Sequence, residues 1–163
     1  MEPTEGQGMD EQPSSRDCFV CGRDNPEGLR TRWFSDRARG EVRTRIAVPE
    51  RFHGYPGVVH GGIVSALLDE GMVRTALLEG AFDDLMVTAR MEVTFRRSAP
   101  TGVLLTVLAR RLRQTGARAQ ARAELVLPDG TVAAVAEGVL VRAPPEVAQA
   151  WAAERPFWRV EEG

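Results

Sequence analysis

The feature of the sequence that most constrains its fold is an apolar helical run, IVSALLDEGMVRTALL, over Ile63–Leu78. Apolar residues cover most of its circumference, and a helix of this kind must be enclosed by other elements. Downstream, apolar and polar residues alternate with the period of two that is typical of strands. The predicted strands cover Arg90–Arg97, Val103–Arg113, Ala117–Leu127 and Thr131–Val141, with earlier ones near Leu29–Phe34 and Glu41–Val48. We therefore predict an α+β fold in which a curled antiparallel sheet wraps around one long central helix.

The length and composition indicate a single domain. The chain has 163 residues, of which 43% are hydrophobic and 27% are charged, enough for one hydrophobic core. Residues 1–16 are rich in Gly, Pro, Ser and acidic side chains, so we expect a disordered N-terminal tail there. The domain is expected over residues 17–154, with a short final helix near Glu146–Glu154, and residues 155–163 are expected to form a C-terminal tail.

Composition also excludes several classes of function. All 21 basic residues are arginine, so neither a Schiff-base lysine nor a P-loop lysine is present. A net charge of −2, with no aromatic platform among the arginines, argues against nucleic acid as a partner. No apolar run approaches the roughly 18 residues of a membrane span, and the polar N-terminus does not resemble a secretory signal. We therefore expect a cytoplasmic protein without a membrane partner.

The residues best suited to chemistry lie at the start of the helical run. His60, Gly61 and Gly62 precede it, and free N–H groups at a helix N-terminus can bind an anion or a polarised carbonyl oxygen. Asp69 is a carboxylate in an otherwise apolar helix, where it can act as a nucleophile or as a general base on water. At 1.5 Å per residue, Gly62 and Asp69 lie about 10 Å apart along the helix axis, too far to share one reacting carbonyl. We therefore hypothesise that Gly62 of one subunit and Asp69 of another form one site, in a homodimer or a dimer of dimers.

This pattern resembles the hotdog-fold thioesterase superfamily, in its PaaI-like branch, whose signature is HGG followed seven residues later by Asp or Glu. The resemblance covers roughly residues 50–142 and includes VTARMEV from Val87 and the Pro128-Asp129-Gly130 hairpin. It implies a hotdog fold and the hydrolysis of an acyl-coenzyme A thioester to free acid and coenzyme A. It also implies that no metal or organic cofactor is needed.

The resemblance further implies roles for four residues. Gly62 matches the glycine whose N–H polarises the thioester carbonyl, and His60 matches the histidine that orients that loop or the carbonyl. Asp69 matches the catalytic carboxylate, and Thr88 matches a Ser or Thr that holds the water or the carboxylate.

Contacts with the substrate are expected from residues around this motif. Arginine suits the phosphates of coenzyme A because its guanidinium group binds phosphate in a bidentate way. The residues predicted to bind the substrate are Gly61, His53, Arg90 and Arg97, and the sequence leaves open which arginines bind the phosphates. Some relatives carry a catalytic Asn or Gln ahead of the HGG motif, where this chain has His53 and Gly54, and the sequence leaves open whether His53 replaces it.

Two other functions fit the same fold. One is a non-catalytic hotdog protein that binds or senses acyl-CoA. The other is a hydratase of enoyl thioesters, which is disfavoured because His53 and His60 have no obvious spacing with Asp69 for an acid–base pair. Glu70, next to Asp69, is expected to pair with an arginine instead of acting in catalysis.

The two cysteines form a separate motif, Cys18-x-x-Cys21-Gly22, that resembles half of a zinc knuckle. A tetrahedral structural zinc needs four ligands, and no second cysteine pair follows, so His53 or Asp17 would have to be recruited. The sequence therefore favours simple packing of the N-terminal turn, and no metal site is expected.

Overall fold

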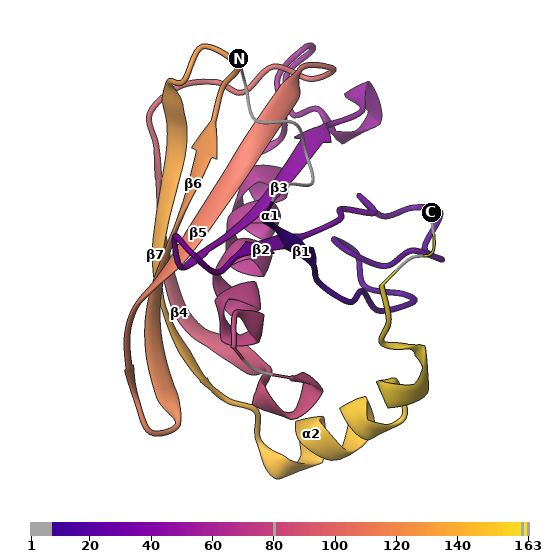
Figure 1. Ribbon diagram of the computed structural model, residues 1–163. Coiled ribbons are helices and arrows are strands. Elements are labelled where there is room, and N and C mark those ends of the chain that lie inside the picture. Colours follow the sequence, from indigo (N-terminus) through magenta and orange to yellow (C-terminus); the bar gives the residue numbers. More distant parts are fainter. Residues whose placement is uncertain (1–7, 80, 161, 163) are drawn as a thin grey trace.

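The computed structural model describes residues 8–79, 81–160 and 162 (Figure 1). The strands are β1 (Asp10–Glu11), β2 (Phe34–Asp36), β3 (Glu41–Ala47), β4 (Met86–Phe95), β5 (Leu104–Thr115), β6 (Arg118–Val126) and β7 (Val132–Arg142). The α-helices are α1 (Gly61–Arg74) and α2 (Pro145–Ala152). Short 3₁₀ turns cover Glu50–Phe52, Thr75–Leu77, Phe82–Asp84 and Arg155–Phe157.

Among the described residues, seven strands form one antiparallel sheet in the order β1-β2-β3-β5-β6-β7-β4. Figure 1 shows the long strands curving around α1, which is the predicted arrangement and is confirmed. Strand β4 lies at the end of the sheet, with β7 as its neighbour within the described part of the chain. Its other edge is therefore available for pairing.

The concave face of the sheet accommodates α1 because small side chains line it. Seven alanines on β5, β6 and at β7 are at most 2% exposed: Ala109, Ala119, Ala121, Ala123, Ala133, Ala134 and Ala136. The helix contacts all three strands. At Gly71 the approach is so close that an added Cβ would lie 3.3 Å from the Cβ of Ala109 and 3.3 Å from the ring of Trp33. Small residues on both surfaces therefore set the distance between helix and sheet.

The N-terminal segment differs from the expected tail in its described part. Strand β1 pairs with β2, and Gln12 and Ser14 are buried. The side-chain amide of Gln12 donates to Ser35 Oγ at 2.8 Å and to the carbonyl oxygen of Arg74 at 3.2 Å. Composition could not predict that this segment is ordered. Its buried polar side chains form hydrogen bonds with residues that lie far away in the sequence. Residues 1–7 of the expected tail lie outside the described residues.

The C-terminal segment also packs on the domain. Arg23 donates to the carbonyl oxygen of Phe157 at 2.5 Å, and Ser14 pairs with Arg159 as an isolated β-bridge. Helix α2 begins one residue before the predicted helix and ends two residues before its predicted end. Within the described residues, no helix is long and apolar enough to span a membrane.

The first predicted strand is shifted. Residues 29–33 connect to β2 without ladder pairing, although Leu29 and Trp33 are buried. The hydroxyl of Thr31 donates to the carbonyl oxygen of Val20 at 2.9 Å and accepts from the indole N–H of Trp33 at 2.8 Å. The backbone N–H groups of Leu29 and Thr31 also donate to the carbonyl oxygens of Phe19 and Val20, both at 2.8 Å. Backbone and side-chain hydrogen bonds therefore fix this segment, and alternation alone does not distinguish that from a strand.

Replacing Leu67 with alanine tests the enclosure of α1. Leu67 is 0% exposed, so Leu67→Ala is expected to lower the free energy of unfolding by about 2–5 kcal/mol through lost burial and a new cavity. The measurement is urea denaturation followed by circular dichroism. As a control, Leu112→Ala on β5 removes a side chain from a residue that is 55% exposed and should change stability by less than about 0.5 kcal/mol. Equal losses in the two variants would contradict the buried position of α1.

Candidate active site

The N-terminus of α1 is capped by a side chain. His60 is the N-cap residue, and its Nδ1 accepts a hydrogen bond from the backbone N–H of Gly62 at 2.9 Å. The N–H groups of Ile63 and Val64 donate to the carbonyl oxygen of His60. Among the described residues, Gly61 is thus the one position in this first turn whose N–H has no hydrogen-bond partner.

This geometry does not favour the oxyanion role predicted for Gly62. Its N–H already donates to the imidazole, whereas the N–H of Gly61 is open at the positive end of the helix dipole. Because Nδ1 of His60 accepts this hydrogen bond, the neutral imidazole carries its proton on Nε2. His60 therefore positions the start of α1.

A cavity of about 620 Å³ lies beside this helix start. Its apolar wall includes Val64, Phe95 and Leu125, and Arg96 and Arg97 lie at its border. Gly61 and His60 also line it, so the open N–H group belongs to a residue of the cavity wall. A cavity of this size with an apolar wall and cationic groups suits a ligand with an apolar part and an anionic part.

Asp69 is held by Thr88, as predicted. The carboxylate of Asp69 is half-buried on α1, and its Oδ1 accepts a hydrogen bond from the hydroxyl of Thr88 on β4 at 2.5 Å. A charged acceptor strengthens such a bond and fixes the orientation of the carboxylate. The structure therefore brings these two predicted residues together within one chain.

A β-bulge explains how Thr88 reaches the helix. The pairing of β4 with β7 shifts between Thr88 and Arg90, which leaves Ala89 as the extra residue. Before the bulge Met86 and Thr88 face α1, and after it Met91 and Val93 pack against the core. Without the bulge, strict alternation would direct Thr88 and Met91 to opposite faces of the sheet.

The two halves of the predicted site do not meet within one chain. Gly61 lines the cavity, whereas Asp69 and Thr88 are not among its lining residues. Eight residues of α-helix separate Gly61 from Asp69 along α1, which corresponds to about 12 Å along the axis. The donor and the carboxylate therefore cannot act on the same carbonyl within one chain.

The predicted substrate contacts fall into two groups. Gly61 and Arg97 line the cavity. Arg90 instead faces away from α1, is exposed and lies 3.8 Å from Glu92, on the outer surface of the sheet. Tyr55 and Phe95 line the cavity and were not singled out from the sequence, although Phe95 ends an alternating strand directly before Arg96 and Arg97.

His53, which stands ahead of the HGG motif, contacts an acidic residue of the same loop. Its Nδ1 lies 3.2 Å from Glu50, and it is absent from the cavity wall. Glu50 also accepts from the Thr101 hydroxyl and from the N–H of Gly57, and these bonds lower the pKa of that carboxyl, the Thr101 bond most strongly. His53 therefore belongs to a network that shapes the loop before the helix.

Gly54 does line the cavity, and its neighbour is the capping histidine. An added Cβ at Gly54 would lie 3.3 Å from Cα and from Cδ2 of His60. A larger residue here would press against the imidazole that caps α1.

Comparison with known proteins defines the class. Residues 56–134 match the sequence model of the thioesterase superfamily. A search of curated proteins finds no match. The chain is therefore similar to the thioesterase superfamily over residues 56–134, just under half of its length, and it has the hotdog fold, as its sequence predicted.

Solved structures agree on the fold at low sequence identity. A thioesterase superfamily protein is 24% identical with a TM-score of 0.70, covering 77% of this chain, and this chain covers only 60% of that protein's length. PaaI of E. coli, from the phenylacetic acid degradation operon, is 20% identical with a TM-score of 0.58 over 64% of this chain and 74% of its own. A protein of Streptococcus mutans UA159, bound to acetyl CoA, is 18% identical with a TM-score of 0.58 over 64% of this chain and 82% of its own.

Substitution of His60 tests the helix cap. His60→Ala leaves the N–H of Gly62 without its acceptor and is expected to lower the free energy of unfolding by about 0.5–2 kcal/mol. His60→Asn supplies another good N-cap acceptor and should retain most of that stability. Urea denaturation of the three proteins measures the difference, and equal stability of the alanine and asparagine variants would contradict the capping role.

Proposed function

We propose that this protein hydrolyses acyl-coenzyme A thioesters. The observation that carries the proposal is the carboxylate of Asp69, which is half-buried on α1 and is oriented by Thr88. Partial burial of a carboxylate costs free energy. If this position on α1 were only structural, an apolar residue would avoid that cost. The match of residues 56–134 to the thioesterase superfamily supports the same reaction.

In the proposed reaction, Asp69 acts on water or on the thioester itself. As a general base it takes a proton from a water molecule while the water oxygen attacks the carbonyl carbon. The C–S bond then breaks, the free acid forms, and coenzyme A leaves as a thiolate that receives the proton from Asp69 and becomes the thiol. Thr88 fixes the carboxylate oxygen that does not receive the proton.

The oxyanion donor in this proposal is Gly61, in place of Gly62. Its N–H is open, lies in the first turn of α1 and belongs to a residue of the cavity wall. Negative charge that develops on the thioester oxygen is stabilised by such a preorganised donor at a helix N-terminus. The N–H of Gly62 remains hydrogen-bonded to His60 and stabilises the first turn of α1.

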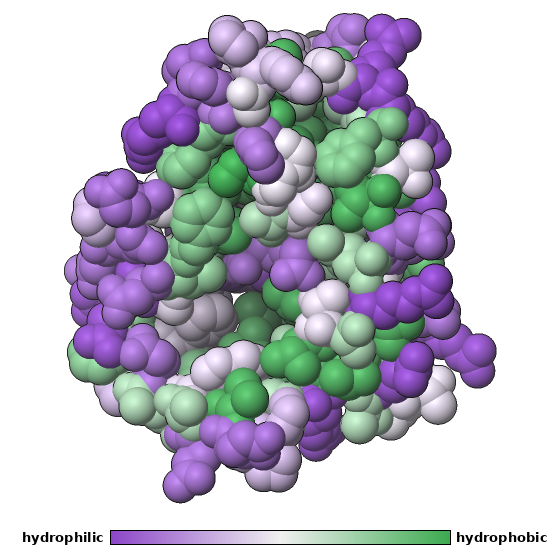
Figure 2. Space-filling view, turned by 180° about the vertical axis from the view of Figure 1, so that it is seen from behind, coloured by the Kyte–Doolittle hydropathy of each residue, from purple (hydrophilic) through white to green (hydrophobic). Residues whose placement is uncertain are grey.

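We place the complete site between two chains. The open edge of β4 lies on the rear side of the view in Figure 1, and Figure 2 shows hydrophobic residues gathered around a hollow on that side. Phe95, at the end of β4, is 54% exposed and adjoins Gly61, whose added Cβ would lie 3.5 Å from the ring. Association of two copies across this side would cover Phe95 and bring Gly61 of one chain to Asp69 of the other.

Acyl-CoA is the proposed substrate because the cavity combines an apolar wall with arginines. Arg96 and Arg97 can bind phosphate oxygens, and the apolar wall can hold the acyl group. The S. mutans structure with the same fold is bound to acetyl CoA, which supports this ligand class. The chemistry assigned to Asp69, Thr88 and Gly61 requires no metal or organic cofactor.

Asp69→Asn is the direct test of the carboxylate. The amide cannot accept the proton or attack, so kcat is expected to fall by about 10²–10⁴-fold while the fold is retained. Release of free thiol from a panel of acyl-CoA substrates measures it. Glu92→Gln is the matched control, because Glu92 is an exposed carboxylate on the outer face of β4 and its loss should leave kcat unchanged. Acyl-CoA binding without turnover in the wild-type protein would instead indicate a sensing protein.

Gly61→Pro tests the donor. Proline lacks the N–H but is well accepted at the first position of a helix, and His60 already has the extended backbone that a following proline requires. The variant is expected to fold normally and to lose about 10²–10³-fold in kcat, whereas Gly61→Ala keeps the N–H and most of the activity.

The same variants show whether the site spans two chains. In a 1:1 mixture of Gly61→Pro and Asp69→Asn, half of the dimers have one intact site out of two, so about a quarter of wild-type activity should return. A mixture that stays inactive after subunit exchange would overturn the shared site.

A further inference from the structure

The two cysteines form a preorganised loop on the side of α1 away from the cavity. The N–H groups of Val20 and Cys21 point at the sulfur of Cys18, with N···S distances of 3.4 and 3.5 Å. At Gly22 an added Cβ would lie 2.4 Å from the carbonyl oxygen of Cys18, so the loop closes only with glycine there. Backbone N–H groups that converge on a sulfur stabilise its thiolate form, which is the form that binds metals.

A third ligand comes from α1. The carboxylate of Glu70 lies 4.0 Å from Cys18 Sγ, and one ligand atom from each of Cys18, Cys21 and Glu70 lies within 4.8 Å of the others. Both cysteines are free thiols. His53 and Asp17, which the sequence suggested as additional zinc ligands, do not belong to this cluster.

The charges around the cluster favour a cation. Arg74 is 1% exposed and forms the ion pair with Glu70 that the sequence predicted, with Nε 2.8 Å from Oε1. Cysteine ligands lose their protons when they bind a metal. Two thiolates and a carboxylate then carry three negative charges, which one divalent cation and Arg74 would neutralise.

We propose that Cys18, Cys21 and Glu70 bind a zinc ion that joins the N-terminal loop to α1. Bond lengths of about 2.3 Å for Zn–S and about 2.0 Å for Zn–O place tetrahedral ligand atoms about 3.5–3.8 Å apart. Since the present separations are within 4.8 Å, they would have to shorten by at most about 1.3 Å. A water molecule or Ser15, whose Oγ is 3.8 Å from Cys21 Sγ, would supply the fourth ligand.

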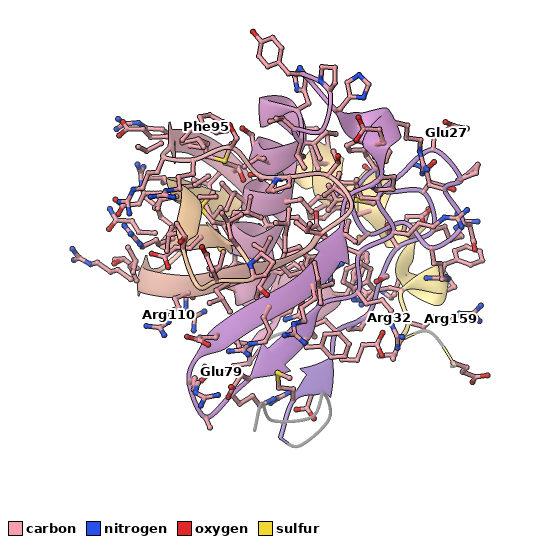
Figure 3. The ribbon with its side chains drawn as sticks, turned by 90° about the horizontal axis from the view of Figure 1, so that it is seen from above. Glu27, Arg32, Glu79, Phe95, Arg110 and Arg159 are labelled. Atoms are coloured by element: carbon pink, nitrogen blue, oxygen red, sulfur yellow. The ribbon has the colours of Figure 1, made fainter. Side chains whose placement is uncertain are left out.

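This site is separate from the cavity and does not rest on the proposed function. None of its three ligands lines the cavity beside Gly61. Figure 3 shows Glu27, in the loop that follows the cysteines, on the opposite side of the molecule from Phe95 of the cavity wall. The zinc would act structurally, by fixing the loop against the helix that carries Asp69.

The test measures metal directly on the full chain. Protein purified without chelator is expected to contain about one zinc per chain by elemental analysis. After the metal is removed, added Co²⁺ should produce thiolate-to-cobalt charge-transfer absorption, and Zn²⁺ should abolish it. Glu70→Gln is expected to weaken zinc affinity by more than about 100-fold, because loss of even an outer-shell partner costs 10–100-fold. Glu27→Gln, an exposed carboxylate near the cysteines, is the matched control and should bind as the wild type does.

Several results would overturn the proposal. Wild-type protein that binds neither zinc nor cobalt contradicts it, whether or not the variants fold. If Cys18→Ser retains zinc, the ion is bound elsewhere. If the cobalt spectrum of Glu70→Gln is the same as that of the wild type, Glu70 is not a ligand. A Cys18–Cys21 disulfide in protein purified without oxidant, detected by mass spectrometry, would make the motif a redox pair.

Discussion

The structure depends on the burial of one helix in the concave face of one sheet. Helix α1 can lie there because alanines line β5, β6 and the start of β7, and because Gly71 lets the helix approach Trp33 and Ala109. Interiors are packed at near-crystalline density, so larger side chains at these positions would push the helix outward. Once α1 is fixed, its first turn lies beside the cavity, and its middle faces β4 on one side and the cysteine loop on another.

Two neighbouring carboxylates on this helix have different surroundings. Asp69 and Glu70 are about 100° apart around the axis, so each faces another part of the protein. Asp69 meets the hydroxyl of Thr88 at the open edge of the sheet, whereas Glu70 lies against the buried Arg74 and two thiols. The pairing of Glu70 with an arginine, predicted from the sequence, is confirmed and separates the residue from the proposed catalytic chemistry.

Some features of the site could be predicted because they follow from local pattern. The contact of Asp69 with Thr88 follows the motif, whereas α1 spans Gly61–Arg74 and so begins two residues before the predicted helix, Ile63–Leu78. The partner of the Gly62 N–H could not be predicted, because it depends on the side-chain orientation of His60 within the first turn. The β-bulge at Ala89 could not be predicted from the sequence either. A bulge is defined by the pairing of two strands, and the sequence does not give the register of β4 against β7.

The sequence by itself determined the architecture: an all-round apolar helix must be enclosed, and the period-two segments that follow it can enclose it only as a curled sheet. It also determined which residue types stand at the helix start and in its middle. Only the tertiary structure decided which N–H is open, which arginines line the cavity and that Glu70 lies near Cys18 and Cys21. The physical reason is that these properties depend on contacts between residues tens of positions apart, and chain periodicity carries no information about such contacts.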